Sequence, residues 1–226
     1  MTSGFGAARQ HMISSGLHLL TTALLGATLA ALGAGLPQAG SLGASGIEMA
    51  GALALYLQFA ALSLVWVVTA PFWRREQPRF RDGGWPSLRA MAWFVPAATL
   101  AQIALGAAYR YRIAGVIPHV TWAFAAAILL FMFGSFVLSQ AGAAPALKRM
   151  AAALVTVTGL QVVLGVAALL YRVAQLGPRW MEWASRAHLA AGAVVLGLAV
   201  MLAAFVLRCA EPASEAQPAA SNGTNA

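Results

Sequence analysis

Charged residues are scarce in this chain, at 9% of its 226 residues against 61% that are hydrophobic. Soluble domains usually carry about 25% charged residues. A chain with so few charges cannot coat a globular surface, so lipid must cover much of it. The deficit excludes an ordinary soluble domain and favours an integral membrane protein.

Acidic residues, cysteine and histidine are also rare. Apart from Glu48 and Glu182, the apolar stretches contain no carboxylates. Because proton pumps and ion-coupled transporters usually need buried carboxylates, this absence argues against both. A single cysteine, Cys209, excludes an internal disulfide and a thiolate metal cluster. The four histidines are His11, His18, His119 and His188.

The basic residues give the chain a formal net charge of +8. They are scattered singly along apolar chain, without a basic helix or an RNA-binding motif, so a nucleic-acid partner is not expected. They are better interpreted as topology signals at the membrane boundaries.

Six stretches are long and apolar enough to cross a membrane, which takes about 20 residues each. They are residues 16–36, 49–70, 90–109, 119–140, 150–171 and 187–207. We therefore expect an all-α integral membrane protein of about six transmembrane helices, in which helices 3–6 form a four-helix bundle. The expected organisation is a cytoplasmic N-terminal tail (1–15), two helices with a basic inner loop (16–89), two repeated hairpins (90–208) and a disordered cytoplasmic tail (209–226).

The distribution of basic residues predicts the orientation. With the N-terminus inside, nine of the fourteen lysines and arginines lie on the inner side and five on the outer side. The positive-inside rule then places both termini in the cytoplasm, for a multi-pass protein of the inner membrane.

The second half of the chain repeats itself as two helical hairpins. The first unit reads Gln102-Ile-Ala-Leu-Gly106, then Tyr109-Arg110, then His119; the second reads Gln161-Val-Val-Leu-Gly165, then Tyr171-Arg172, then His188. Repeated hairpins often pack about a pseudo-symmetry axis with the functional site between them. The repeat therefore predicts that both histidines lie near the outer face, on opposite sides of one cavity.

Two neutral imidazoles facing each other across a four-helix bundle are what a six-coordinate haem iron needs. We therefore predict that helices 3–6 form a haem-binding bundle with haem b as the cofactor and with His119 and His188 as its iron ligands. The competing interpretation is that each is simply a polar residue at the membrane interface. His18 has no partner in the repeat, and for it an interfacial role is favoured; His11 belongs to the N-terminal tail.

Four outer arginines could meet the two propionates of a haem, since an arginine–carboxylate contact can be bidentate and is strong in an apolar setting. They are Arg110, Arg112, Arg172 and Arg186. A local ion pair with Glu182, four residues earlier on the helix, competes for Arg186. Gln102 and Gln161 are polar at membrane depth, so we expect them to hydrogen-bond across helices rather than to contact a cofactor.

With these motifs, the chain resembles the haem A synthase family, the membrane proteins of cytochrome oxidase assembly. The resemblance covers most of the chain from about Met49 and is clearest between Pro86 and Arg208. It implies two tandem four-helix bundles in which histidines near the outer helix starts bind haem. Carried over, His119 and His188 match the ligand pair of the second bundle, which is thought to hold haem b.

The chain departs from the family pattern in its first half. It has six expected helices instead of eight, and the family's Glu-x-x-His-Arg motif is incomplete. If the registers correspond, Glu48 is kept but Gly51 and Ala52 replace the histidine and arginine; alternatively, the first two helices match the last two of the first bundle, and a histidine is missing there too. Haem methyl oxidation within one such chain is then hard to support, and whether the protein is an enzyme stays open.

The leading hypothesis is a haem b-binding membrane protein in haem A biosynthesis or oxidase assembly. Its expected partners are membrane lipid, haem and either another oxidase-assembly protein or a second copy. One alternative is a b-type electron-transfer cytochrome, which usually needs a second histidine pair; only His18 is available on the inner side. The other alternative is a haem-free assembly or scaffold protein.

Overall fold

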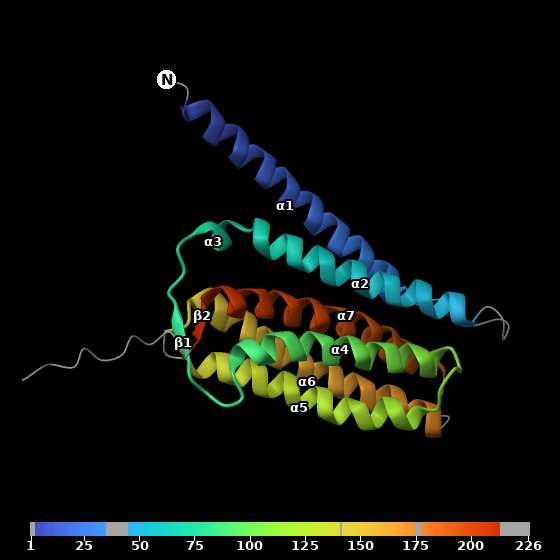
Figure 1. Ribbon diagram of the computed structural model, residues 1–226. Coiled ribbons are helices and arrows are strands. Elements are labelled where there is room, and N and C mark those ends of the chain that lie inside the picture. Colours follow the sequence, from blue (N-terminus) through green and yellow to red (C-terminus); the bar gives the residue numbers. More distant parts are fainter. Residues whose placement is uncertain (1–2, 35–44, 141, 175–177, 213–226) are drawn as a thin grey trace, which may run out of the picture.

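The computed structural model describes residues 3–34, 45–140, 142–174 and 178–212. Its long helices are α1 (Ser3–Gly33), α2 (Ser45–Thr69), α4 (Leu88–Arg110), α5 (Val116–Ser139), α6 (Pro145–Ala174) and α7 (Pro178–Cys209) (Figure 1). One turn of helix, α3 (Pro71–Arg74), follows α2. Each of the six long helices carries a stretch long and apolar enough to cross a membrane. The protein is therefore an all-α membrane protein, which confirms the predicted fold class.

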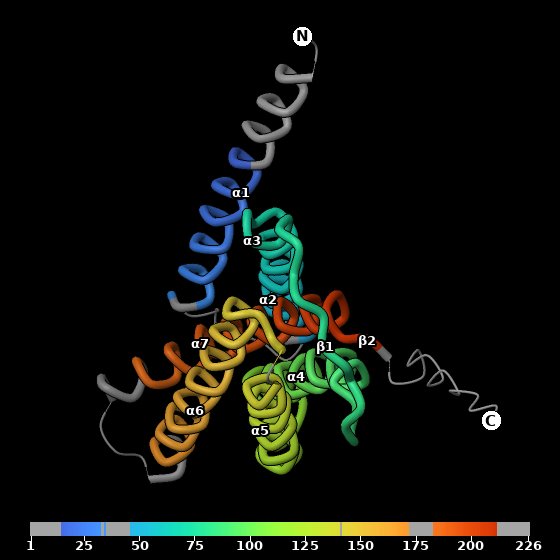
Figure 2. The backbone as a smooth tube through the Cα atoms, turned by 90° about the vertical axis from the view of Figure 1, so that its left-hand side faces the viewer, coloured from blue at the N-terminus to red at the C-terminus, as the bar shows by residue number. Residues whose placement is uncertain are grey.

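Helices α4, α5, α6 and α7 form a four-helix bundle. Each contacts its neighbour in the chain, and α4 closes the ring by packing against α7. Helices α1 and α2 pack against each other and against α7 from outside this ring (Figures 1 and 2). The bundle thus consists of the two repeated hairpins, and α7 is the bundle helix that contacts both helices of the N-terminal pair.

Burial differs strongly between the two helices of the second hairpin. Within their membrane-crossing stretches, 56% of the α7 residues are buried against 11% of the α6 residues. Small side chains allow α7 to be surrounded in this way. At Gly197 of α7, for example, an added Cβ would lie 2.8 Å from the ring of Phe59 on α2. Helix α6 instead presents most of its surface to lipid.

The larger apolar core lies toward the end of the bundle where α4 and α6 begin and α5 and α7 end. We call this the basic end, because Arg74, Arg75, Arg79 and Arg81 lie in the segment that leads to it. Its fully buried side chains come from all the bundle helices and include Val95, Phe133, Leu147, Leu154, Leu202 and Phe205. Bulky residues therefore fill the bundle at this end.

A pair of short strands joins distant parts of the chain at the basic end. Strand β1 (Phe80–Asp82) pairs in parallel with β2 (Ala210–Pro212), which follows α7 directly. Arg89 lies at the start of α4 and donates to the carbonyl oxygens of Leu207 and Ala210, at 3.1 and 2.9 Å. These bonds tie the start of α4 to the end of α7.

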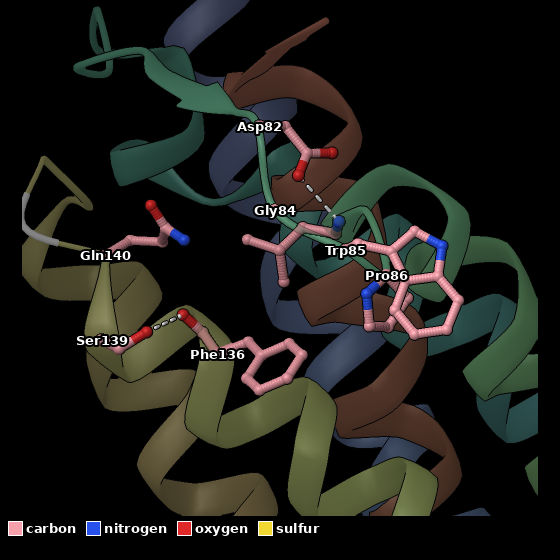
Figure 3. Close-up of a pocket in the computed structure, with 8 residues that line it drawn as sticks. Asp82, Gly84, Trp85, Pro86, Phe136, Ser139 and Gln140 are labelled. Atoms are coloured by element: carbon pink, nitrogen blue, oxygen red, sulfur yellow. Dashed lines mark hydrogen bonds between the residues drawn. The ribbon is translucent and has the colours of Figure 1, made fainter. Parts of the chain in front are cut away.

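Asp82 links the strand pair to helix α4. One of its carboxylate oxygens accepts the backbone N–H of Leu88 at 2.8 Å (Figure 3). The other accepts the backbone N–H of Arg89, also at 2.8 Å. The first N–H groups of a helix have no partner within the helix, and an acidic side chain there is also stabilised by the helix dipole. Asp82 is buried, so its carboxylate serves as an internal cap for α4.

The structure differs from the predicted organisation near both termini. Helix α1 begins at Ser3, within the segment predicted as a tail (1–15). The segment 209–226 was predicted to be disordered because of its polar composition, but Cys209 ends α7 and residues 210–212 form β2. The backbone groups of β1 supply these residues with hydrogen-bond partners that composition does not reveal. Residues 213–226 lie outside the described part of the chain.

We expect Asp82→Ala to lower the free energy of unfolding by about 1–2 kcal/mol, because α4 loses the cap on two N–H groups. Thermal unfolding of the detergent-purified protein, followed by tryptophan fluorescence, would measure this loss. Glu76→Ala is the control, since Glu76 is an exposed carboxylate of the same segment. Equal stability of the two variants would contradict the capping role.

Candidate functional site

The two histidines of the repeat lie at the end of the bundle opposite the basic end. His119 is in the first turn of α5, and His188 lies in α7, which begins at the same end. Each ring packs against the helix that precedes its own, α4 for His119 and α6 for His188. We call this region the histidine end.

In the first hairpin, His119 is seated on Gly106 of α4. A Cβ added at Gly106 would lie only 2.9 Å from Cε1 of the His119 ring, so the ring occupies the space that a side chain would take. One turn earlier on α4, the amide nitrogen of Gln102 lies 3.1 Å from His119 Nδ1. The ring of Tyr109 stacks on the imidazole at 6.4 Å between centroids and an angle of 13°.

The second hairpin repeats this seat. A Cβ at Gly165 of α6 would lie 2.8 Å from Cε1 of His188. His188 Nδ1 lies 3.1 Å from the backbone carbonyl oxygen of Gln161, and its Nε2 lies 3.5 Å from the amide nitrogen of the same residue. Gly192 of α7 leaves room for that amide, since a Cβ there would be 3.2 Å from it.

The spacing of the motif explains the geometry. Residues four apart on a helix lie on the same face, one turn from each other. Gln102 and Gly106 therefore meet one imidazole together, the glycine beneath the ring and the glutamine at its nitrogen. Gln161 and Gly165 do the same for His188. The predicted cross-helix hydrogen bonding of the two glutamines is confirmed.

Both glutamines leave one polar atom without a partner. The side-chain oxygens of Gln102 and Gln161 are buried, and no described residue hydrogen-bonds to them. A buried polar group without a partner costs about 1–3 kcal/mol. The same atom lacks a hydrogen-bond partner in both repeats. This end of the bundle is therefore the first place to look for a binding site.

The two histidine seats lie at the same end of the bundle, one on α5 and the other on α7. The hydroxyl of Tyr56 on α2 donates to the carbonyl oxygen of Leu189, at 3.0 Å. Helix α2 therefore borders the site beside His188.

The predicted propionate-binding arginines are placed differently from one another. Arg110 is partly buried; Arg112 is exposed in the following turn, where its φ of 58° lies in the left-handed region. Arg186 lies over the ring of Trp183 at 5.7 Å. The side chains of Arg172 and Glu182 lie outside the described residues, and so does the predicted pair of Glu182 with Arg186. A propionate role for these arginines stays a prediction.

Two tyrosines at the site were not assigned a role from the sequence. Tyr109 precedes Arg110, as Tyr171 precedes Arg172 in the second unit, and this repetition could have pointed to it. No such signal exists for Tyr56, because α2 stands outside the repeats and its contact with α7 joins residues 133 apart.

His18 lies at the other end of the molecule. Its Nδ1 is 3.4 Å from the Thr69 hydroxyl, and its ring packs on Trp66 at 4.9 Å. The interfacial role favoured for His18 from the sequence stays a prediction. The side chain of His11 lies outside the described residues. Among the residues that the structure describes, no cluster of three or more histidine, cysteine, aspartate or glutamate side chains could hold a metal.

A surface hollow at the basic end is less promising as a site (Figure 3). The Asp82 carboxylate at its edge is bonded to the backbone of α4. The Ser139 hydroxyl donates to the carbonyl oxygen of Phe136 within the same helix, at 2.8 Å. Two of its polar side chains are therefore already engaged. The hollow is lined by Asp82, Gly84, Trp85, Pro86, Leu88, Phe136, Ser139 and Gln140.

Comparison with known proteins adds no assignment: no family model, curated protein or solved structure matches this chain. The site must therefore be judged on its own residues.

Gly106→Ala and Gly165→Ala should each lower the free energy of unfolding by about 1–3 kcal/mol, because the new methyl group overlaps a histidine ring. Gly159→Ala is the matched control on α6, since nothing lies within 4 Å of a Cβ at that position. Thermal unfolding in detergent would compare the three variants. If Gly159→Ala were as damaging as the other two, the seats would not be tightly packed.

Proposed function

We propose that this protein binds one haem b between His119 and His188 and acts in haem A biosynthesis or cytochrome oxidase assembly. The observation that carries the proposal is the repeated seat, in which a glycine and a glutamine on one helix hold a histidine of the next. Two such seats at the same end of one bundle supply a pair of imidazoles at membrane depth. Two imidazoles are the ligand set of a low-spin haem iron.

The residues fit such a cofactor. Each imidazole is set into a glycine notch whose Cβ space it fills, which fixes the ring against its own hairpin. The Gln161 backbone carbonyl oxygen lies 3.1 Å from Nδ1 of His188, and the Gln102 side-chain oxygen, which is buried without a partner among the described residues, is a possible acceptor beside His119. Metal-bound histidines usually donate their second ring N–H to such an acceptor. Bound there, haem b supplies an iron that exchanges single electrons.

The arginines of the histidine end have a role in the same proposal. Arg110, Arg112, Arg172 and Arg186 would neutralise the haem propionates through charge-assisted hydrogen bonds. They are also four of the five outer basic residues that weaken the positive-inside distribution, under which both termini are cytoplasmic and the protein lies in the inner membrane. Binding of the propionates would explain why these arginines lie on the outer side.

The activity proposed is narrower than that of a complete haem A synthase. In the first half of the chain, Glu48 matches the glutamate of that family's Glu-x-x-His-Arg motif, but the histidine and arginine are missing. One oxygen of Glu48 is buried without a partner among the described residues, but no histidine accompanies it on α2. A second protein or a second copy would supply the missing half. A two-haem electron-transfer cytochrome is less well supported, because His18 is engaged with Thr69 and Trp66.

The visible spectrum of the detergent-purified protein, dithionite-reduced minus oxidised and combined with a pyridine haemochrome assay, tests the proposal. We expect a low-spin b-type signal that is lost in both His119→Ala and His188→Ala. His18→Ala is the control and should keep the signal, since its ring packs at the basic end.

Absence of haem from the wild-type protein after expression with ample haem supply would refute the cofactor and favour a haem-free scaffold. A signal that survives either substitution at the site would refute the ligand assignment.

A further inference from the structure

The basic end carries more positive charge than its own acidic residues can balance. Among the described residues, eight basic side chains lie there against three acidic ones. The Asp82 carboxylate is bonded to the backbone of α4, and Glu211 pairs with Arg79 at 3.2 Å. Arg89 is engaged with two backbone carbonyl oxygens. Six basic residues have no ion pair within the described part of the chain: Arg74, Arg75, Arg81, Lys148, Arg149 and Arg208.

Arg208 has the best-defined surroundings of these six residues. It lies in the last turn of α7, and its guanidinium carbon stands over the ring of Trp73 on α3, 4.5 Å from the ring centre. This cation–π contact holds the guanidinium in a fixed orientation. Arg208 is exposed, and the N–H groups of a guanidinium lie in one plane, so the ring contact leaves them accessible. Such a planar fork can bind two oxygens of one phosphate group at once.

An aromatic cluster continues from Trp73 into the membrane-crossing part of the protein. Trp73 meets the Phe205 ring edge-on at 5.0 Å between centroids, and Phe72 stacks on the same ring at 5.6 Å. Trp66 lies 6.2 Å from Phe72. Trp66 and Phe205 belong to the apolar stretches of α2 and α7, whereas α3 lies just beyond the end of α2. The cluster therefore crosses the boundary between the apolar helices and the charged segment.

The rings of this cluster are not completely covered by the protein. Trp66, Phe72 and Trp73 are only partly buried. A phospholipid needs positive charge for its head group and apolar surface for its acyl chains, and basic residues beside interfacial aromatic rings supply both. A soluble phosphate or an acidic peptide would use the charges alone. The combination of cations and accessible rings therefore favours a lipid.

We propose that the basic end binds the head group of an anionic phospholipid, with Arg208 contacting its phosphate. Arg74 and Arg75 directly follow Trp73 in the chain, and Lys148 and Arg149 lie in the first turns of α6, which packs against α7. Their charge favours a head group that is negative overall. Each such residue strengthens the attraction about fivefold, the equivalent of about 1 kcal/mol. The site is at the end opposite the histidines, so it does not depend on the proposed haem.

The end of α7 is held by bonds that do not involve the Arg208 side chain. The carbonyl oxygen of Leu207 accepts from Arg89 at 3.1 Å, and β2, which begins at Ala210, pairs with β1. These contacts remain when the side chain at position 208 is changed. Substitutions there can therefore report on lipid binding separately from folding.

Native mass spectrometry of the detergent-purified protein tests the proposal, by titration with phosphatidylglycerol and with phosphatidylcholine of the same acyl chains. We expect phosphatidylglycerol to bind more tightly. Arg208→Gln should weaken its binding about tenfold or more, because charge-assisted hydrogen bonds to the phosphate are lost. Arg79→Gln is the matched control. It removes one positive charge from the same end, but Arg79 is already paired with Glu211, so it should weaken binding far less.

Two further variants separate a defined site from a diffuse positive field. Arg208→Lys keeps the charge but loses the planar fork, and Trp73→Leu keeps every charge but removes the ring beneath the guanidinium. Each should weaken phosphatidylglycerol binding about fivefold, as expected for the loss of one hydrogen bond or one cation–π contact. These variants also decide the question if Arg208→Gln does not fold.

Three results would overturn the proposal. Equal affinity for the two lipids would exclude a preference for anionic head groups. Wild-type affinity in both Arg208→Lys and Trp73→Leu would show that only a diffuse field attracts the lipid. Displacement of phosphatidylglycerol by an equal concentration of inorganic phosphate would identify a soluble anion as the ligand.

Discussion

Polar side chains at membrane depth must find their partners within the protein, because lipid offers them none. Gln102 and Gln161 find theirs in the imidazoles of the next helix, and this constraint determines much of the bundle. A glutamine can reach the ring only if the two helices approach closely, and Gly106 and Gly165 permit that approach. The hydrogen bond, the glycine notch and the histidine of the next helix therefore form one unit, which the chain uses twice. The histidine lies in the first turn of α5 in one unit and ten residues after the start of α7 in the other.

The two ends of the bundle differ in how their interior is filled and in whether their buried polar groups have hydrogen-bond partners. Large side chains such as Phe133 and Phe205 fill the basic end, and Asp82 and Arg89 satisfy the backbone groups of α4 and α7 there. At the histidine end, polar atoms of both glutamines remain without partners. The closely packed apolar core therefore lies at one end of the bundle, and the unpartnered polar atoms of the two glutamines lie at the other.

The sequence predicts the six helices well, because long apolar stretches with few charges have one common solution in a membrane. It also predicts that Gln102 and Gln161 bond across helices, since polarity at that depth leaves no alternative. The choice of ring nitrogen at His119 and His188 was out of reach, because it depends on distances of a few tenths of an ångström. Contacts such as Tyr56 with Leu189, or β1 with β2, join segments too distant in sequence for periodicity to connect them.

The pairing of β1 with β2 has a consequence for the order in which the protein is assembled. Strand β1 leaves the ribosome before α4, whereas β2 follows α7, so β1 waits for its partner while four further helices are inserted. The carbonyl groups that Arg89 binds also belong to the last helix and its extension. Closure of the basic end is thus a late event of biogenesis, and it marks a chain in which all six helices have been inserted.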